Sequence, residues 1–221
     1  MSTTKQQAKK KPESNSSLIY WIIGGVLGLG LIVWLAFAIA TEADVEESIA
    51  FGEVTVEGGT NLPFFDSATS DPGVGLTAPT VTGEDWEGDE YTIGPDGRAK
   101  IIVMLAHWCP HCQAEVPVIQ DWVDGGGLPE GVDLYGVTVL SNRLRDSSTW
   151  PPQEWLEAEG WTSPTIMDDE GGSVVEAYGL TSTPTYVILD GDNNNLGRFA
   201  GEIGVQGLNT LAALAESSLQ G

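Results

Sequence analysis

Cysteine, histidine and basic residues are scarce in this 221-residue sequence, and each scarcity narrows its possible functions. The chain has two cysteines and two histidines, and nine lysines and arginines stand against 32 aspartates and glutamates. So few sulfur and imidazole groups leave little from which to build a zinc or copper centre. A formal net charge of −23 repels phosphate backbones, which argues against nucleic-acid binding.

The few basic residues are unevenly distributed. Lys5, Lys9, Lys10 and Lys11 precede the first apolar run, whereas from residue 41 onward five basic side chains face 31 acidic ones, a net charge of −26. We interpret this acidic surface as a solvated coat that favours solubility or tolerance of salt. An acidic docking face is the alternative.

Charge is absent altogether from residues 18–40. At about 1.5 Å per residue, a helix of that length reaches roughly 34 Å, enough to cross a bilayer. The sequence therefore predicts a single transmembrane helix, preceded by a disordered tail over residues 1–17. A signal peptide cleaved after Ala40 is the alternative, but its apolar region would be unusually long. The upstream lysines predict a cytoplasmic N-terminus and an extracytoplasmic C-terminal part in the cell membrane.

The rest of the chain predicts a linker and one domain. Residues 41–73 are acidic and mixed, with one strand-like stretch at 53–56, and we expect an extracytoplasmic linker there. From residue 74 to 219 the apolar periodicity becomes regular. It predicts strands at 101–106, 132–140, 185–189 and 196–200, and helices at 110–123, 152–159, 173–178 and 207–217. This order is typical of an α/β fold with a central mixed β-sheet flanked by helices.

Both cysteines belong to one short motif, Trp108-Cys109-Pro110-His111-Cys112, at the predicted junction of a strand and a helix. The unpaired N–H groups and dipole of a helix N-terminus stabilise a thiolate at Cys109. Cys112 follows one turn later, within reach of Cys109. Pro110 suits the first helical position, and a protonated His111 would favour the thiolate further. This arrangement predicts a redox-active pair.

Three other interpretations of the cysteine pair remain open. A purely structural disulfide would close so small a loop that it adds little stability. A zinc site would need two further ligands, and outside the motif only His107 could supply an imidazole. A copper-handling site would lack a distant histidine to complete its ligands.

The stretch from Trp108 to Pro117 resembles the W-C-x-x-C-x-x-E-x-P signature of the thioredoxin superfamily, and within it the TlpA/ResA-like membrane-anchored oxidoreductases. The resemblance covers residues 74 to 219 and implies a thioredoxin-like fold. It implies that Cys109 attacks and Cys112 resolves, that Glu115 helps to move protons, and that Pro117 kinks the helix.

Thr183 and Pro184 resemble the cis-proline loop of the same family, which faces the disulfide. Together with Trp108, this loop is expected to form the apolar patch where an extended polypeptide docks. Two departures leave the direction of electron flow open. The buried aspartate of thioredoxins has no match here, and the Cys-Pro-His-Cys centre is that of the DsbA-type oxidases.

The predicted activity is dithiol–disulfide exchange with the thiols and disulfides of exported polypeptides, without metal or organic cofactor. A further redox partner, in the membrane or outside the cytoplasm, is expected to return the cysteine pair to its starting redox state. One alternative is a TlpA/ResA-like reductase for cytochrome c maturation. The other is a thioredoxin-fold adhesion or metal-handling module without turnover.

Overall fold

The structure is a computed structural model that describes residues 27–37, 50–66, 70–146 and 148–220. The chain divides into two compact units, Met1–Val45 and Glu46–Gly221. In the first unit, residues 27–37 form a helix. Within the described ranges, no helix has the length and apolar character needed to cross a bilayer. The predicted tail lies outside the described residues, and so does much of the predicted span over 18–40.

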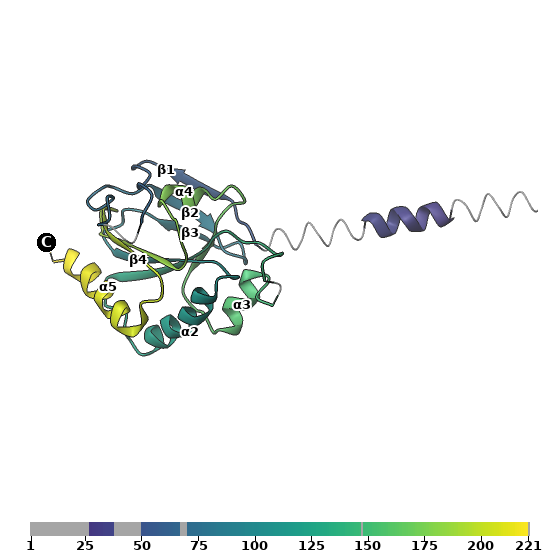
Figure 1. The fold of residues 1–221 in the computed structure, drawn as a ribbon. Coiled ribbons are helices and arrows are strands. Elements are labelled where there is room, and N and C mark those ends of the chain that lie inside the picture. The colour runs from purple at the N-terminus through teal and green to yellow at the C-terminus, as the bar shows by residue number, and fades with distance from the viewer. Residues whose placement is uncertain (1–26, 38–49, 67–69, 147, 221) are drawn as a thin grey trace, which may run out of the picture. The chain divides into compact units, whose positions relative to one another are not determined.

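The second unit begins with strands and then interleaves helices with further strands (Figure 1). Its elements are β1 (Val54–Glu57), β2 (Thr80–Glu84), β3 (Glu90–Ile93), β4 (Ala99–Leu105), α2 (Pro110–Asp124), β5 (Val132–Thr138), α3 (Pro152–Ala158), β6 (Thr165–Met167), α4 (Ser173–Ala177), β7 (Thr185–Leu189), β8 (Asn195–Ala200) and α5 (Gly204–Ser218).

Strand β4 is the centre of a five-stranded sheet with the order β6-β5-β4-β7-β8. It pairs parallel with β5 and antiparallel with β7, so the sheet is mixed. All seven residues of β4 are buried, which fits a continuous apolar run covered on both faces. The predicted α/β fold with a central mixed sheet is therefore confirmed.

The two faces of β4 belong to two separate apolar cores. Ile101, Val103 and Leu105 pack with residues of α2, α3 and α5, while Ile102 and Met104 pack with residues of β2, β3 and α4. Successive side chains of a strand point to opposite faces, so one strand serves both cores. Figure 1 shows α2 and α5 on one side of β4, with α4 and the first strands on the other.

The small sheet β1-β2-β3 differs from the sequence expectation of a linker up to residue 73. Strand β1 pairs with β2, Val54 lying opposite Gly83, and its valines pack against the second core. Leu62 and Phe65, also in the expected linker, are buried. This segment is part of the compact unit because its alternate apolar residues find core surface to cover. The β2–β3 hairpin is not among the predicted elements.

An ion pair joins this N-terminal segment to the sheet edge. Arg198 in β8 binds the carboxylate of Asp71, and its Nη1 donates to the carbonyls of Pro63 (2.8 Å) and Tyr178 (2.7 Å). Burial acts to raise the pKa of Asp71, but the bonds from Arg198 and Asn195 outweigh it and leave that pKa lowered. Removal of one partner of such a buried pair would destabilise the fold strongly, because the other charge would remain buried without its partner.

Candidate active site at the start of helix α2

The strand β4 and the helix α2 are joined by a turn that holds the first cysteine. The backbone N–H of Cys109 donates to the carbonyl of Ala106 (2.9 Å), and Cys109 is the residue that caps α2. Pro110 follows at the first helical position, where its missing N–H costs no helical hydrogen bond. Cys109 therefore sits where the N-terminal amides of a 15-residue helix converge.

The thiol of Cys109 has a lowered pKa. Burial acts to raise it, but a side-chain hydrogen bond with Thr183 and main-chain bonds from Cys112 and His111 outweigh burial. As a thiol, its Sγ donates to the Thr183 carbonyl at 3.3 Å. The residue is 6% exposed, so the sulfur lies at the surface end of the core. A thiolate favoured by helix amides is the form that attacks a disulfide.

Cys112 has the opposite character. It is fully buried, and burial raises its pKa to about 12, with a further contribution from the negative charge of Cys109. Its Sγ accepts a hydrogen bond from the backbone N–H of Ala106 at 3.5 Å. Both cysteines are free thiols in this structure. The pair thus consists of one reactive sulfur and one that keeps its proton.

Glu115 is buried beside the cysteine helix with only 3% of its surface exposed. Its Oε1 accepts three hydrogen bonds, from the Tyr186 hydroxyl (2.9 Å) and from the N–H groups of Ile203 (3.0 Å) and Gly204 (2.9 Å). The two amides belong to the start of α5, where a carboxylate is stabilised by the helix dipole. Gly204 has φ +58°, which an L side chain rarely adopts. Glu115 is therefore not a solvated helix residue.

The loop before β7 forms the wall opposite the cysteines. The Thr183–Pro184 peptide bond is cis, as the resemblance implied. The carbonyl of Thr183 faces the Cys109 sulfur, and the carbonyl of Pro184 accepts the N–H of Gly201 (2.8 Å). The structure thus brings the cysteines and Glu115, which share helix α2, together with this loop from a distant segment of the chain.

Trp108 lies on the other flank of the motif. Its indole Nε1 donates to the carbonyl of Leu140 (2.8 Å), and the guanidinium of Arg145 stacks over its ring at 3.8 Å from the centroid. Cation–aromatic contacts of this kind stabilise both partners. Trp108 is half-buried and packs against the first core.

His111 forms an ion pair between its Nδ1 and the carboxylate of Glu202 when it is protonated. Both side chains are largely exposed. Glu202 lies in the short loop between β8 and α5, immediately before the amides that bind Glu115. A carboxylate this close offsets the charge that His111 would otherwise apply to the Cys109 thiolate.

His107, which precedes the cysteine motif, is buried, with only 1% of its surface exposed. Its Nε2 accepts the N–H of Asn142 (3.2 Å), its Nδ1 contacts the Thr149 hydroxyl (3.2 Å), and its ring packs edge-on against Trp150. Burial lowers its pKa, so the neutral ring acts as a packed structural element.

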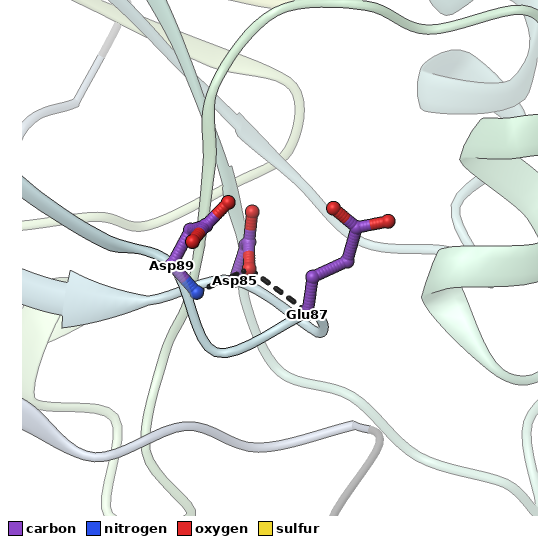
Figure 2. A group of neighbouring side chains, drawn as sticks. All are labelled: Asp85, Glu87 and Asp89. Carbon is purple, nitrogen blue, oxygen red and sulfur yellow. Dashed lines mark hydrogen bonds between the residues drawn. The ribbon is translucent and has the colours of Figure 1, made fainter.

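An acidic cluster occurs in the β2–β3 turn (Figure 2). Carboxylate oxygens of Asp85, Glu87 and Asp89 lie within 4.8 Å of one another. Asp85 Oδ1 accepts the backbone N–H groups of Glu87 (2.8 Å) and Asp89 (2.9 Å), which stabilises the turn. Among the described residues this is the one group of three potential metal ligands of its kind, and it contains neither cysteine.

Sequence reasoning missed several residues of the site: Tyr186, Glu202, Gly204 and Arg145. They lie 33 to 92 positions downstream of Cys112 in the chain. One signal was available for Tyr186, because a polar tip inside the apolar run Thr185–Leu189 needs a buried partner. Nothing local marks the others, since exposed charged residues are common.

The assembled site can carry out thiol–disulfide chemistry. The thiol of lowered pKa, Cys109, is the nucleophile, and the fully buried thiol one turn away can resolve a mixed disulfide. A buried carboxylate lies on the same helix. The carbonyl of Thr183 faces the reactive sulfur.

Known proteins resemble this chain over the same region. Residues 74–194 match the AhpC/TSA family. The chain is 24% identical over 104 residues to a sporulation thiol-disulfide oxidoreductase A of Bacillus subtilis, covering 47% of this chain and 60% of that protein. It is 24% identical over 108 residues to a thiol-disulfide oxidoreductase ResA of Halalkalibacterium halodurans, covering 48% and 57%. The chain thus matches less than two thirds of each relative.

A solved structure supports the fold. The thioredoxin domain of a thiol-disulfide oxidoreductase from Bacteroides vulgatus superposes with a TM-score of 0.50 at 20% identity, covering 64% of this chain and 97% of that one. The fold resemblance drawn from the cysteine motif is confirmed.

Proposed function

This chain belongs to the AhpC/TSA family, and from that membership and its cysteine pair we propose that it is a thiol:disulfide oxidoreductase acting on exported polypeptides. The observation that carries the proposal is the contrast between the two sulfurs. Cys109 caps α2 and has a lowered pKa, whereas Cys112 is buried with its pKa raised to about 12.

In the reducing direction, the Cys109 thiolate attacks one sulfur of a client disulfide. The client S–S bond breaks, a Cys109–client bond forms, and the released client thiolate takes a proton from solvent. Cys112 then loses its proton and attacks Cys109 Sγ, which releases the second client thiol. Two electrons have passed to the client, and the protein holds a Cys109–Cys112 disulfide.

The high pKa of Cys112 delays the second attack. The negative charge of Cys109 contributes to that pKa, and this contribution disappears once Cys109 is bonded to the client. Cys112 therefore becomes easier to deprotonate when it is needed. Glu115, on the same helix, is the buried carboxylate available to help move that proton.

The direct test uses two serine variants. Cys109→Ser should abolish reduction of insulin by the protein with dithiothreitol, while Cys112→Ser should accumulate mixed disulfides with client proteins. A Cys109→Ser variant with unchanged insulin reduction would support a binding or metal-handling module instead. The trapped clients would identify whether exported proteins are the substrates.

The location of the protein is part of the proposal. Residues 18–40 would anchor it in the cell membrane, with Lys5 to Lys11 on the cytoplasmic side and the redox domain outside. The uncharged 23-residue run and the upstream lysines support this topology. Protease treatment of intact spheroplasts should degrade the domain; protection of the domain would overturn the topology.

One contact favours a reductase, in which electrons flow from the protein to its clients, for example in cytochrome c maturation. The Glu202 carboxylate offsets His111, the residue that would make a Cys-Pro-His-Cys centre strongly oxidising. A measured reduction potential decides the question. A value near thioredoxin's, about −270 mV, supports a reductase, and one near DsbA's, about −120 mV, supports an oxidase.

A further inference from the structure

Lys100 and Arg198 of the redox domain are buried and each pairs with a carboxylate. The other three basic residues, Arg98, Arg143 and Arg145, are exposed. Arg143 and Arg145 lie together in the segment that follows β5. In a domain of net charge −26, this one short segment therefore holds two of the three exposed arginines.

That segment, residues 140–146, is attached to the wall of the active site. Leu140 accepts the Trp108 indole N–H, and Arg145 stacks over the Trp108 ring. On the same side, Gln113 of α2 donates to Asp146 at 3.2 Å. Trp108 directly precedes Cys109, so the cation of Arg145 is stacked on the residue next to the reactive cysteine.

Leu140 adds a second observation. Its φ is +53°, a left-handed conformation that costs a non-glycine residue about 1 kcal/mol. Strain of this kind persists where surrounding contacts hold it, and it is frequent at ligand-binding segments. Here the strained residue supplies the carbonyl that binds Trp108, so the bend fixes residues 140–146 against the site.

The charge that this segment holds at the site is positive. The guanidinium of Arg145 lies over the Trp108 ring, while the Asp146 carboxylate is engaged by Ser148 and Gln113. At about 0.1 M salt the screening length is about 10 Å, so a client at Cys109 responds to adjacent charges more than to distant carboxylates. On the other flank, His111 and Glu202 offset each other.

We propose that residues 140–146 form a docking segment for client polypeptides that carry carboxylates next to their reactive cysteine. This inference rests on the proposed function and adds the chemical class of its clients. A guanidinium stacked on an aromatic ring keeps its N–H edges available for a planar carboxylate. Arg145 would bind such a carboxylate while the neighbouring client sulfur reaches Cys109.

The test measures the attack of Cys109 on three short peptides. Each has one cysteine activated as a 2-thiopyridyl disulfide, flanked by aspartates, serines or lysines. At low ionic strength the aspartate peptide should react about threefold to tenfold faster than the serine peptide, and about 0.5 M salt should remove the difference. Arg145→Gln should remove the preference, so that the aspartate and serine peptides react with this variant at equal rates.

Arg98→Gln is the matched control. Arg98 is also exposed, but it pairs with Asp133 near the start of β4, whereas Cys109 follows the end of that strand. Removing it changes the net charge by the same amount without touching the site. The Arg98 variant should keep the full aspartate preference, because the proposal assigns that preference to position 145.

The outcomes distinguish a failure of the docking proposal from a failure of the proposed function. Equal rates for the three peptides, a faster lysine peptide, or equal losses in the two variants would overturn docking at residues 140–146. In all of those cases Cys109 would still react, and the oxidoreductase would stand. If neither the peptides nor hydroxyethyl disulfide reacted with Cys109, the proposed function itself would fail.

Discussion

The hydroxyl of Tyr186 donates to Oε1 of Glu115 at 2.9 Å, inside the core. This bond joins β7, which follows the cis-proline loop, to α2, which carries both cysteines. The same oxygen binds two amides at the start of α5. One carboxylate therefore fixes three elements around the redox pair, and its hydrogen bonds hold them in register.

Tyr186→Phe should destabilise the fold by about 1.5–3 kcal/mol, because it removes a hydrogen bond to a buried carboxylate. The change is nearly isosteric, so packing is preserved. Urea unfolding monitored by tryptophan fluorescence measures the free energy of unfolding.

Tyr178→Phe is the control for this substitution. Tyr178 is also buried, but within the described part of the chain its hydroxyl has no hydrogen-bond partner. Its removal should leave stability unchanged or raise it. If both variants lost the same free energy, the Tyr186–Glu115 bond would not be the cause.

The two thiols should differ sharply in alkylation. In Cys112→Ser, Cys109 should react with iodoacetamide with a midpoint below the value of about 8.5 of free cysteine. In Cys109→Ser, Cys112 should stay unmodified at neutral pH, because burial raises its pKa to about 12 and blocks access. Mass spectrometry across a pH series measures both. Similar profiles for the two sulfurs would contradict the assigned roles.

Glu202→Gln should make the disulfide more oxidising. Loss of the carboxylate leaves the positive charge of a protonated His111 uncompensated, and that charge stabilises the Cys109 thiolate. We expect the reduction potential to rise by roughly 10–30 mV, measured against glutathione. In a His111→Ala background the same substitution should have little effect. An equal rise in both backgrounds would show that Glu202 acts on Cys109 directly.

The parts of the site that the sequence predicted are those encoded locally. The cysteine spacing, the strand before it and the proline after it specify a helix N-terminus beneath Cys109 within about ten residues. The cis-proline loop was recognisable because Thr183 and Pro184 directly precede an apolar strand.

The parts that were not predicted depend on contacts between distant segments. Strand β1 is four residues long, and the sequence predicted strand character there, but not its pairing with β2 or the packing of its valines against the second core. Glu202 and Arg145 are ordinary charged residues until the fold brings them to His111 and Trp108. Their partners are set by tertiary packing, which periodicity does not encode.

Another buried carboxylate, Asp168, lies outside the redox site. Its oxygens accept the N–H groups of Asp169, Val174 and Val175, at 2.9 to 3.3 Å, and so cap the start of α4. Despite these bonds, burial raises its pKa to about 6 from a usual value of 3.8. The folded state therefore holds this proton more tightly than the unfolded chain does.

This difference makes stability depend on pH. Between about pH 4 and pH 6 the folded state binds more protons at Asp168 than the unfolded state does. The contribution of Asp168 to the free energy of unfolding therefore falls as the pH rises and levels off above pH 6. Two pKa units correspond to about 3 kcal/mol.

Asp168→Asn keeps an acceptor for Val174 but cannot ionise. The stability of the natural protein relative to this variant should therefore fall by up to that amount between pH 4 and 7. Asp121→Asn, at an exposed position of α2, should leave the pH profile of urea unfolding unchanged. Parallel profiles for the natural protein and Asp168→Asn would mean that Asp168 has the same pKa in the folded and unfolded states. Asp168 would then contribute to stability only through its hydrogen bonds to the start of α4.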